Sequence, residues 1–342
     1  MNTTDLHMKI TDFKLSQGRD LKESSTKMYI GNIMKLSRHL NEGKLVDGYE
    51  WLMDIELVKK KLEDKGLAMT SIRNFMNTAI LYLQINKAGK DIIDKYMISR
   101  DELNDKYEEI ASTGKFSESQ SKAYITMPEL HKFIESIAKD LKSFKLKDKL
   151  KNNESLTNKE KHLLQIYLVL NIHAEVALRN DLAGTRVVKK DVFEKMSEEQ
   201  QKKGNYLVYN RLNMFLYLND YKTDKVYKSK KIVLSKDLRK VVNFYLKFNE
   251  GNEYLLTKLD GTPKSKNNLT QDLRNESLKR LNKAISTTML RKIYLTDKYS
   301  DLKNELKKDN ENMMHSMNTA LTHYIKDKPS PNEESDNNNE AK

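Results

Sequence analysis

The sequence predicts a mainly α-helical protein with one small antiparallel β-sheet, arranged as an all-helical N-terminal part and a mixed α and β C-terminal part. Three observations predict this arrangement. Apolar residues recur at helical spacing over most of the chain, three short β-type segments occur together between residues 206 and 234, and a polar, serine-rich stretch at 111–122 has no periodicity. A chain of 342 residues is long enough for two domains that each have a core.

The N-terminal part, residues 1–110, is expected to form a helical domain. Residues that can cap a helix precede two long apolar stripes, and a shorter helix lies between these stripes. These elements are Ser24 or Ser25 before the stripe at 28–40, the short helix at 55–62, and Thr70 before the stripe at 72–83. Four cations fall largely off the apolar faces and give this part a basic exterior: Lys27, Lys35, Arg38 and Arg73. A helical domain with ordinary solvated cations has the same pattern.

The stretch 111–122 is predicted to be a linker, and a second domain follows at 123–326. Pro128 lies near the start of its first helix, where a missing N–H costs least. Strands are expected at 206–209, 214–218 and 231–234, and helices near 128–142, 158–178, 236–249, 268–283, 287–299, 301–311 and 317–326. The last residues, 327–342, are polar and are predicted to be disordered.

Composition limits the chemistry that the chain can perform. It contains no cysteine, which excludes disulfides, cysteine-based zinc sites and thiol catalysis, and we expect no metal and no cofactor. The best apolar run, 163–178, is interrupted by polar residues such as Asn171 and Glu175, so it predicts a buried helix and no membrane span. The N-terminus lacks the residue order of a secretory signal, so we expect an intracellular protein.

The net charge predicts a polyanionic partner. Lysine and arginine exceed aspartate and glutamate by 13, and the pI is about 9.3. Double-stranded DNA, RNA and an anionic membrane surface would all bind such a chain. A lysine-rich chain that is merely soluble has the same balance, so charge alone does not decide the partner.

Five residues that can act on a phosphodiester occur in a fixed order in the second domain. Arg179 follows the long apolar helix, Lys222 lies on the hairpin before the third strand, and Arg291 lies in a later helix. His315 and Tyr324 come near the end of the chain. Each motif is weak alone, but the ordered set resembles the tyrosine recombinase (phage-type integrase) family. The resemblance covers nearly the whole chain, because the N-terminal part is similar to the family's core-binding domain and the second domain to its catalytic domain.

The resemblance implies that these residues cut and rejoin DNA. The two arginines would hold the non-bridging phosphate oxygens and stabilise the charge of the transition state. The tyrosine would attack phosphorus, and the resulting 3′-phosphotyrosine would keep the bond for religation without ATP or metal. A tyrosine has a reference pKa near 10, so its ionisation at pH 7 costs about 4 kcal/mol before clustered positive charge lowers that cost. The hairpin lysine would protonate the leaving oxygen, which is worth about 10²–10⁴-fold in rate.

The sequence also departs from the family pattern. Thr288 stands where the family usually has a histidine three residues before the second arginine, and a hydroxyl does not accept a proton at neutral pH. Lys292 can supply charge there instead. Asp181 lies one place before the family's usual acidic position, and Met314 replaces a glycine. These departures affect the expected rate and proton transfers more than the reaction class. A degenerate copy of the family that has lost its activity stays an alternative.

Each candidate residue has an ordinary structural interpretation as well. Arg179 can cap the end of its helix, and Lys222 competes with other lysines of the same hairpin. We favour Lys222 because the Lys-Thr pair before the turn matches the family best. His173 and His323 are interpreted as structural.

The predicted function is therefore a site-specific recombinase or integrase that binds double-stranded DNA as a homo-tetramer on paired sites, with no membrane partner. A type IB topoisomerase or a telomere resolvase would share the active site, and relaxation of supercoils by a monomer or hairpin ends on linear DNA would distinguish them. Thr288 supports a third alternative, a DNA-binding relative that lost catalysis. A membrane-bound helical scaffold would need a concentrated basic face, whereas the charge here is spread along the chain.

Overall fold

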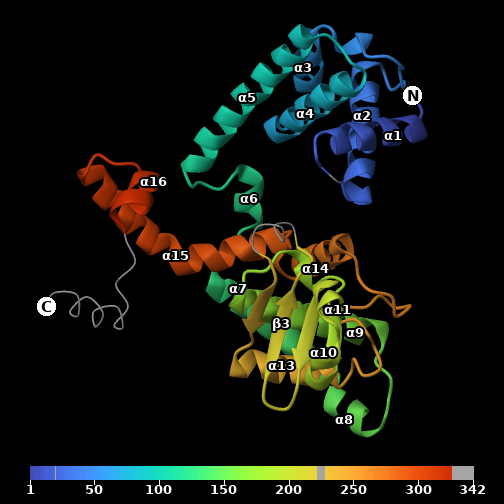
Figure 1. Ribbon diagram of the computed structural model, residues 1–342. Coiled ribbons are helices and arrows are strands. Elements are labelled where there is room, and N and C mark those ends of the chain that lie inside the picture. Colours follow the sequence, from blue (N-terminus) through green and yellow to red (C-terminus); the bar gives the residue numbers. More distant parts are fainter. Residues whose placement is uncertain (20, 222–227, 326–342) are drawn as a thin grey trace, which may run out of the picture. The chain divides into compact units, whose positions relative to one another are not determined.

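The computed structural model describes residues 1–19, 21–221 and 228–325. The chain divides into two compact units, Met1–Phe116 and Ser117–Lys342, which we call the N-terminal unit and the C-terminal unit (Figure 1).

The predicted linker, 111–122, spans the division between the two units and is partly helical. A long helix of the N-terminal unit continues to Ser112, and a short helix, α6 (Glu118–Ala123), begins at a capping box formed by Ser117 and Gln120. The sequence predicts an irregular segment here, because the six residues of α6 are too few to show a helical period. The predicted disordered tail, 327–342, lies outside the described residues.

The described residues of the N-terminal unit form helices and turns. The elements are α1 (Thr3–Ser16), α2 (Glu23–Leu40), the 3-10 turn η1 (Glu50–Leu52), α3 (Ile55–Glu63), α4 (Met69–Ile85) and α5 (Lys90–Ser112). The caps predicted for two of these helices are wrong. α2 starts after Lys22 and α4 after Ala68, and neither residue caps with its side chain.

The helices of this unit share one core. Leu36 of α2 and Met76 of α4 are fully buried there, and so is Tyr96 of α5, whose hydroxyl donates to the Leu52 carbonyl at 3.0 Å. Trp51, the only tryptophan of the chain, packs at the margin of this core with its ring 5.5 Å from that of Tyr82.

The C-terminal unit is mainly helical with one small sheet. Its elements after α6 are α7 (Met127–Ser143), α8 (Leu146–Lys151), α9 (Asn158–Glu175), η2 (Asn180–Leu182), β1 (Arg186–Lys189), α10 (Lys190–Lys195), α11 (Glu198–Lys202), β2 (Tyr206–Tyr209), β3 (Met214–Leu218), β4 (Lys230–Val233), α13 (Lys236–Leu246), α14 (Lys266–Leu281), α15 (Thr287–Asn312), α16 (Met317–Thr319) and the π-helical turn η3 (Ala320–Tyr324).

The sheet is mixed, whereas an antiparallel sheet was predicted. Its strand order is β1-β2-β3-β4, with β1 parallel to β2 and the other pairs antiparallel. α10 and α11 form the crossover that a parallel pair requires. The sequence missed β1 because its four residues, only two of them apolar, give no clear alternation. The three predicted strands are present, and the last of them begins one residue earlier than expected.

Side chains of the strands alternate between two apolar layers. Leu207 and Leu216 pack into the main core with α9 and α13, while Val208 and Phe215 pack against Phe193 of α10 on the other face. This alternation follows from the two-residue period of a strand and fixes the register of the sheet.

α9 is the central helix of the unit. It is apolar over most of its circumference, with Leu168, Val169, Leu170 and Ile172 all fully buried, and it contacts α7, α13 and α15. A helix that is hydrophobic all round is stable only when other elements surround it. Its last residue, Glu175, lies three residues before the predicted end.

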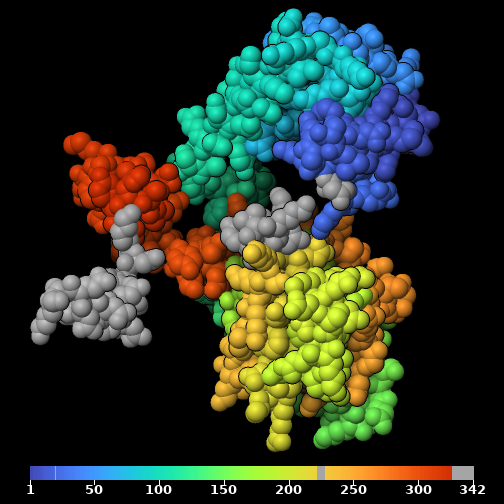
Figure 2. Space-filling model, viewed as in Figure 1, coloured from blue at the N-terminus to red at the C-terminus, as the bar shows by residue number. Residues whose placement is uncertain are grey.

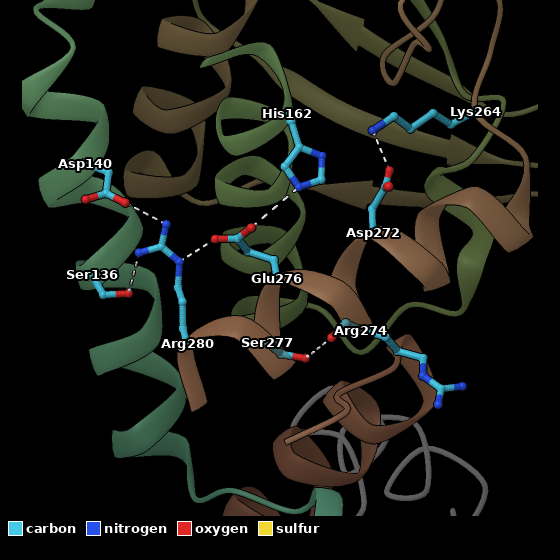
Figure 3. Close-up of polar contacts among 9 residues, drawn as sticks. All are labelled: Ser136, Asp140, His162, Lys264, Asp272, Arg274, Glu276, Ser277 and Arg280. Atoms are coloured by element: carbon cyan, nitrogen blue, oxygen red, sulfur yellow. Dashed lines mark hydrogen bonds and ion pairs between the residues drawn. The ribbon is translucent and has the colours of Figure 1, made fainter. Parts of the chain in front are cut away.

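A network of ion pairs joins α14 to its neighbours (Figure 3). Arg280 of α14 contacts Glu276 of the same helix at 2.5 Å and Asp140 of α7 at 2.6 Å. Glu276, which is nearly buried, also lies 3.7 Å from the ring of His162 on α9. Arg280 therefore joins α14 to α7 through two carboxylates, and Glu276 also contacts His162 of α9, a ring whose pKa is lowered by burial.

The helices predicted at 287–299 and 301–311 are one continuous helix, α15. Between Thr287 and Ile293 it carries several buried residues, but from 295 to 309 every residue is at least partly exposed. The first part packs on α9 and α7, and α16 contacts the helix as well. The final predicted helix, 317–326, consists of α16 and the π-helical turn η3.

Candidate functional site

The first predicted arginine lies on a turn beyond the end of α9. Arg179 has an extended backbone and immediately precedes η2, three residues beyond Val176, the C-cap residue of α9. Leu178 and Leu182 are buried on either side of the turn. They anchor it in the core, while Arg179 itself stays partly exposed.

Arg291 lies near the start of α15, beside Arg179. Burial lowers the pKa of Arg291, and the charge of Arg179 lowers it further, whereas Asp181 acts in the opposite direction. The Nε atom of Arg291 is buried, and within the described part of the chain no group accepts its hydrogen bond. Two partly buried guanidiniums that repel one another form a natural binding site for an oxyanion.

Asp181 lies on the same turn and is nearly buried. Burial raises the pKa of its carboxyl group, and the charges of Lys266, Arg179 and Arg291 partly offset that rise. Its carbonyl accepts a hydrogen bond from the Asn205 amide at 3.0 Å. The structure thus brings three of the predicted site residues together on the turn after α9 and the first turns of α15.

Asn205 is a site residue that sequence reasoning missed. Its amide donates to the carbonyls of Asp181 and Asp220, and its oxygen accepts from the backbone N–H groups of Asn219 and Asp220, at 2.8 to 3.1 Å. It therefore ties the turn after Arg179 to the end of β3. An asparagine before a strand carries no sequence signal for such a role. Lys222, two residues further on, lies outside the described residues.

His173 of α9 also lies beside this group. Its ring is fully buried, and Nδ1 is 2.8 Å from the Val169 carbonyl. Burial lowers the pKa of His173, and the charge of Arg291 acts in the same direction. A neutral ring in the core agrees with its interpretation as a structural residue.

Thr288, which replaces the family's histidine, and Lys292, which can supply charge in its place, flank Arg291 differently. Thr288 is exposed, whereas Lys292 is partly buried. Burial lowers the pKa of Lys292.

His315 and Tyr324 form a second group at the other end of α15. Their rings stack with centroids 4.8 Å apart, and the side chain of Tyr324 is 59% exposed. From Arg291 to the end of α15 the helix runs 21 residues, which at 1.5 Å per residue is about 32 Å. The structure therefore does not bring this pair to the arginines.

The segment that carries Tyr324, residues 313–325, has little core of its own. Ala320 is buried, but Met314, Leu321 and Ile325 are exposed. The end of α15 and α16 are drawn in red in Figure 2. Exposed apolar groups at this density are unusual on a free surface.

In the N-terminal unit, three of the predicted DNA-binding cations lie on the exposed face of α2. Lys27, Lys35 and Arg38 are all exposed. The fourth, Arg73 of α4, lies over the ring of Tyr107 at 4.7 Å. A cation held over an aromatic ring keeps its charge and loses side-chain freedom.

A polar hollow of about 630 Å³ in the same unit was missed by sequence reasoning. Its polar lining residues come from the end of α1 and from α2, α4 and α5: Lys14, Gln17, Arg19, Tyr29, Asn32, Asn74, Asn77, Thr78, Gln84 and Arg100. Asn74, Asn77 and Gln84 share one stripe of α4, at spacings of three and seven residues. The asparagines resemble ordinary solvated residues in the sequence, which is why the pattern gave no signal.

In the part of the chain that the structure describes, no cluster of three or more His, Asp or Glu side chains is arranged to hold a metal ion. Among the same residues, no helix combines the length and the apolar character that a membrane span requires.

Comparison with solved structures gave matches, whereas no family model and no curated protein matched the sequence. The Tn1549 transposon integrase in complex with a circular intermediate DNA is 13% identical over 97% of this chain and 98% of that chain, with a TM-score of 0.50. The same integrase with transposon right end DNA is 14% identical over 96% of each chain, with a TM-score of 0.48. XerH site-specific recombinase bound to difH substrate is 14% identical over 97% of this chain and 95% of that chain, with a TM-score of 0.36.

At 13% identity, the likeness to the Tn1549 integrase shows a shared fold. It is the fold that the resemblance to tyrosine recombinases implied, mainly helical with a small sheet in the C-terminal unit.

Proposed function

We propose that the chain is a site-specific DNA recombinase or integrase that cleaves and rejoins DNA strands through a 3′-phosphotyrosine intermediate. The observation that carries this proposal is that Arg179 and Arg291 lie close enough for the charge of Arg179 to lower the pKa of Arg291, with the buried Asp181 near both. In the proposed assignment, residues 1–110 are the DNA-binding domain, 111–122 the linker and 123–326 the catalytic domain.

The arginine pair fits the charge that develops on a phosphodiester under attack. Each guanidinium can donate paired hydrogen bonds to a non-bridging oxygen, and the unpartnered Nε of Arg291 is one such donor. The bound anion would relieve the repulsion between the two arginines. Asp181 is the acidic group beside the pair, and its charge acts to raise the pKa of Arg291.

In the reaction, the hydroxyl oxygen of Tyr324 bonds to phosphorus as the bond to the 5′ oxygen breaks. On the sequence resemblance alone, we assign to Lys222 the donation of a proton to that leaving oxygen. His315, which stacks on Tyr324, is the group that we propose to contact the phosphate or to take the tyrosine's proton. Attack of a 5′ hydroxyl on the phosphotyrosine reverses these steps, so that the strands are joined again and Tyr324 is released.

Tyr324 reaches an arginine pair only if its segment changes position or if a second copy of the chain supplies the pair. The exposed apolar side chains of residues 313–325 support docking of this segment on a second copy, within a homo-tetramer on paired DNA sites. Mixing two inactive variants, Tyr324→Phe and Arg291→Ala, separates these possibilities. Recovered cleavage in the mixture means that the tyrosine acts on the partner's site, and no recovery means that it acts within its own chain.

DNA contact by the N-terminal unit is assigned to the exposed cations of α2 and to the polar hollow. Lysine and arginine supply affinity through the phosphates, and amide side chains can contact phosphates or base edges. Lys27, Lys35, Arg38 and Arg73 are the proposed phosphate contacts. Replacing two of them by alanine should weaken DNA binding uniformly across sequences and lower its dependence on salt.

The test of the proposed function is a search for a covalent protein–DNA adduct. Nicked duplexes drawn from fragments that flank the coding region would be incubated with wild type, with Tyr324→Phe and with a matched control, Tyr299→Phe. The control removes the hydroxyl of an exposed tyrosine on α15, away from η3. An adduct with wild type and Tyr299→Phe, absent with Tyr324→Phe and formed without ATP or metal, supports the proposal. Specific DNA binding with no adduct from any protein would leave a DNA-binding relative that has lost catalysis.

A further inference from the structure

The side chain of Asn180, the residue after Arg179, bonds to two helices that are distant in sequence. Its Nδ2 donates to Thr270 Oγ1 of α14 at 3.0 Å. Its Oδ1 accepts a hydrogen bond from Thr287 Oγ1 of α15, and these residues are 107 positions apart. The Thr270 hydroxyl donates in turn to the Lys266 carbonyl, so that each group in this chain of bonds has a donor or an acceptor.

Thr287 connects this bond to the second arginine. It is the first residue of α15, its side chain is buried, and it lies four residues before Arg291. Residues four apart in a helix lie on the same face, one turn from each other. A hydrogen bond at Thr287 therefore fixes the position of α15 along its axis and its rotation about that axis, and with them the position of Arg291.

We propose that Asn180 is a positioning residue, which sets Arg179 and Arg291 against one another by joining their two segments. This inference rests on the proposed function. Arg179 and Asn180 are neighbours on one segment, and Thr287 and Arg291 are one turn apart on the other. The Asn180–Thr287 hydrogen bond thus links the two segments next to the arginine pair.

The charges in the site explain why an amide suits this place. Arg179 and Arg291 repel each other, so a contact must hold their segments together until DNA binds. A carboxylate at 180 would pair with the arginines and compete with the phosphate. A neutral amide bonds to the two threonine hydroxyls and adds no charge that would pair with either guanidinium.

A double-mutant cycle tests the proposal with the full-length chain. Asn180→Ala, Thr287→Val and the double variant each remove the same bond, while Thr287→Ser keeps the hydroxyl. Asn275→Ala is the matched control, because it removes an exposed amide bond to Gln271 elsewhere on α14. Each protein is tested for urea stability, for the Kd of a duplex that traps with wild type, and for the single-turnover rate of adduct formation at saturating DNA.

We expect the two single variants to lose about 100-fold in the single-turnover rate, the loss that a misplacement of about 1 Å causes, with little change in Kd. The double variant should be no slower than the slower single variant, because one bond is lost in all three. Thr287→Ser and Asn275→Ala should keep the wild-type rate. Thr287→Val keeps the test valid if Asn180→Ala does not fold.

Two results would overturn the inference. Rates near wild type in folded Asn180→Ala and Thr287→Val would show that the bond does not position the arginines, and independent, multiplying losses in the double variant would show that the residues do not act through one bond. Absence of an adduct from wild type is a different result. It removes the proposed function, and this inference with it.

Discussion

Removal of the Arg280 side chain should destabilise the C-terminal unit by about 3 kcal/mol. Arg280 links Asp140 of α7 and Glu276 of α14, and the side chain of Glu276 is only 6% exposed. In Arg280→Ala the Glu276 carboxylate stays buried with only His162 beside it (Figure 3). Removing one partner of a buried ion pair costs about 3–5 kcal/mol, and we take the lower value because Asp140 is largely solvated.

The assay uses urea unfolding with two probes. Circular dichroism reports on both units, whereas fluorescence reports on Trp51, the only tryptophan, in the N-terminal unit. With a slope of about 3 kcal/mol per molar urea for a unit of this size, a loss of about 3 kcal/mol moves the midpoint by about 1 M. The fluorescence transition of the N-terminal unit should stay in place.

A paired variant checks the cause. Arg280→Met combined with Glu276→Leu removes both charges and should recover most of the loss, because no unpaired carboxylate then stays buried. A loss of unfolding free energy below about 0.5 kcal/mol in Arg280→Ala would refute the reasoning. Water would then stabilise the Glu276 carboxylate to the same extent as Arg280 does in the wild type. A paired variant that is less stable than Arg280→Ala would also refute it.

Three further outcomes are expected. Burial holds the pKa of His173 below its usual value, so its contribution to stability is complete above the unfolded pKa of about 6.5 and is lost as the pH falls. Below about pH 6.5, unfolding should therefore show a slope of up to about 1.4 kcal/mol per pH unit that is smaller in His173→Gln. Tyr96→Phe leaves the buried Leu52 carbonyl without its donor and should cost about 1 kcal/mol, read from Trp51 fluorescence. Met314 has a φ of 56° and is almost fully exposed, so Met314→Gly should stabilise its turn by about 1 kcal/mol, measured as slower hydrogen exchange of residues 313–325; faster exchange would contradict this.

Long periodic segments of the fold could be predicted from the sequence, and short ones could not. The long apolar run of α9 and the apolar and aromatic runs of β2 and β3, on either side of a short turn, placed these elements within a few residues. β1 has only four residues and depends on pairing with β2, so its own sequence carries little signal. The sequence predicts a break in α15 at residue 300, because the charged second half of the helix lacks an apolar stripe. No glycine or proline that would end a helix occurs in α15, and the helix is continuous.

The candidate site shows the same division. The order of arginines along the chain predicted Arg179 and Arg291 as one group, and the structure brings them together. The contacts that hold them, from Asn180 and Asn205, join residues that are far apart in the chain, and an asparagine's type does not say what it bonds to. The position of Tyr324 depends on the length and continuity of α15, for which the sequence predicts two separate helices.

The two outer strands of the sheet differ in how they avoid joining other chains. β1 is covered along its open side, where the Val187 N–H donates to the Glu253 carbonyl at 2.8 Å and Arg186 forms a bridge to Tyr254. Among the described residues no strand pairs with the outer side of β4, but β4 carries Lys230 and Lys231, whose charges oppose the approach of a second, similar strand. In copies of the chain crowded together at high concentration, both outer strands of the described sheet therefore oppose amyloid-like stacking.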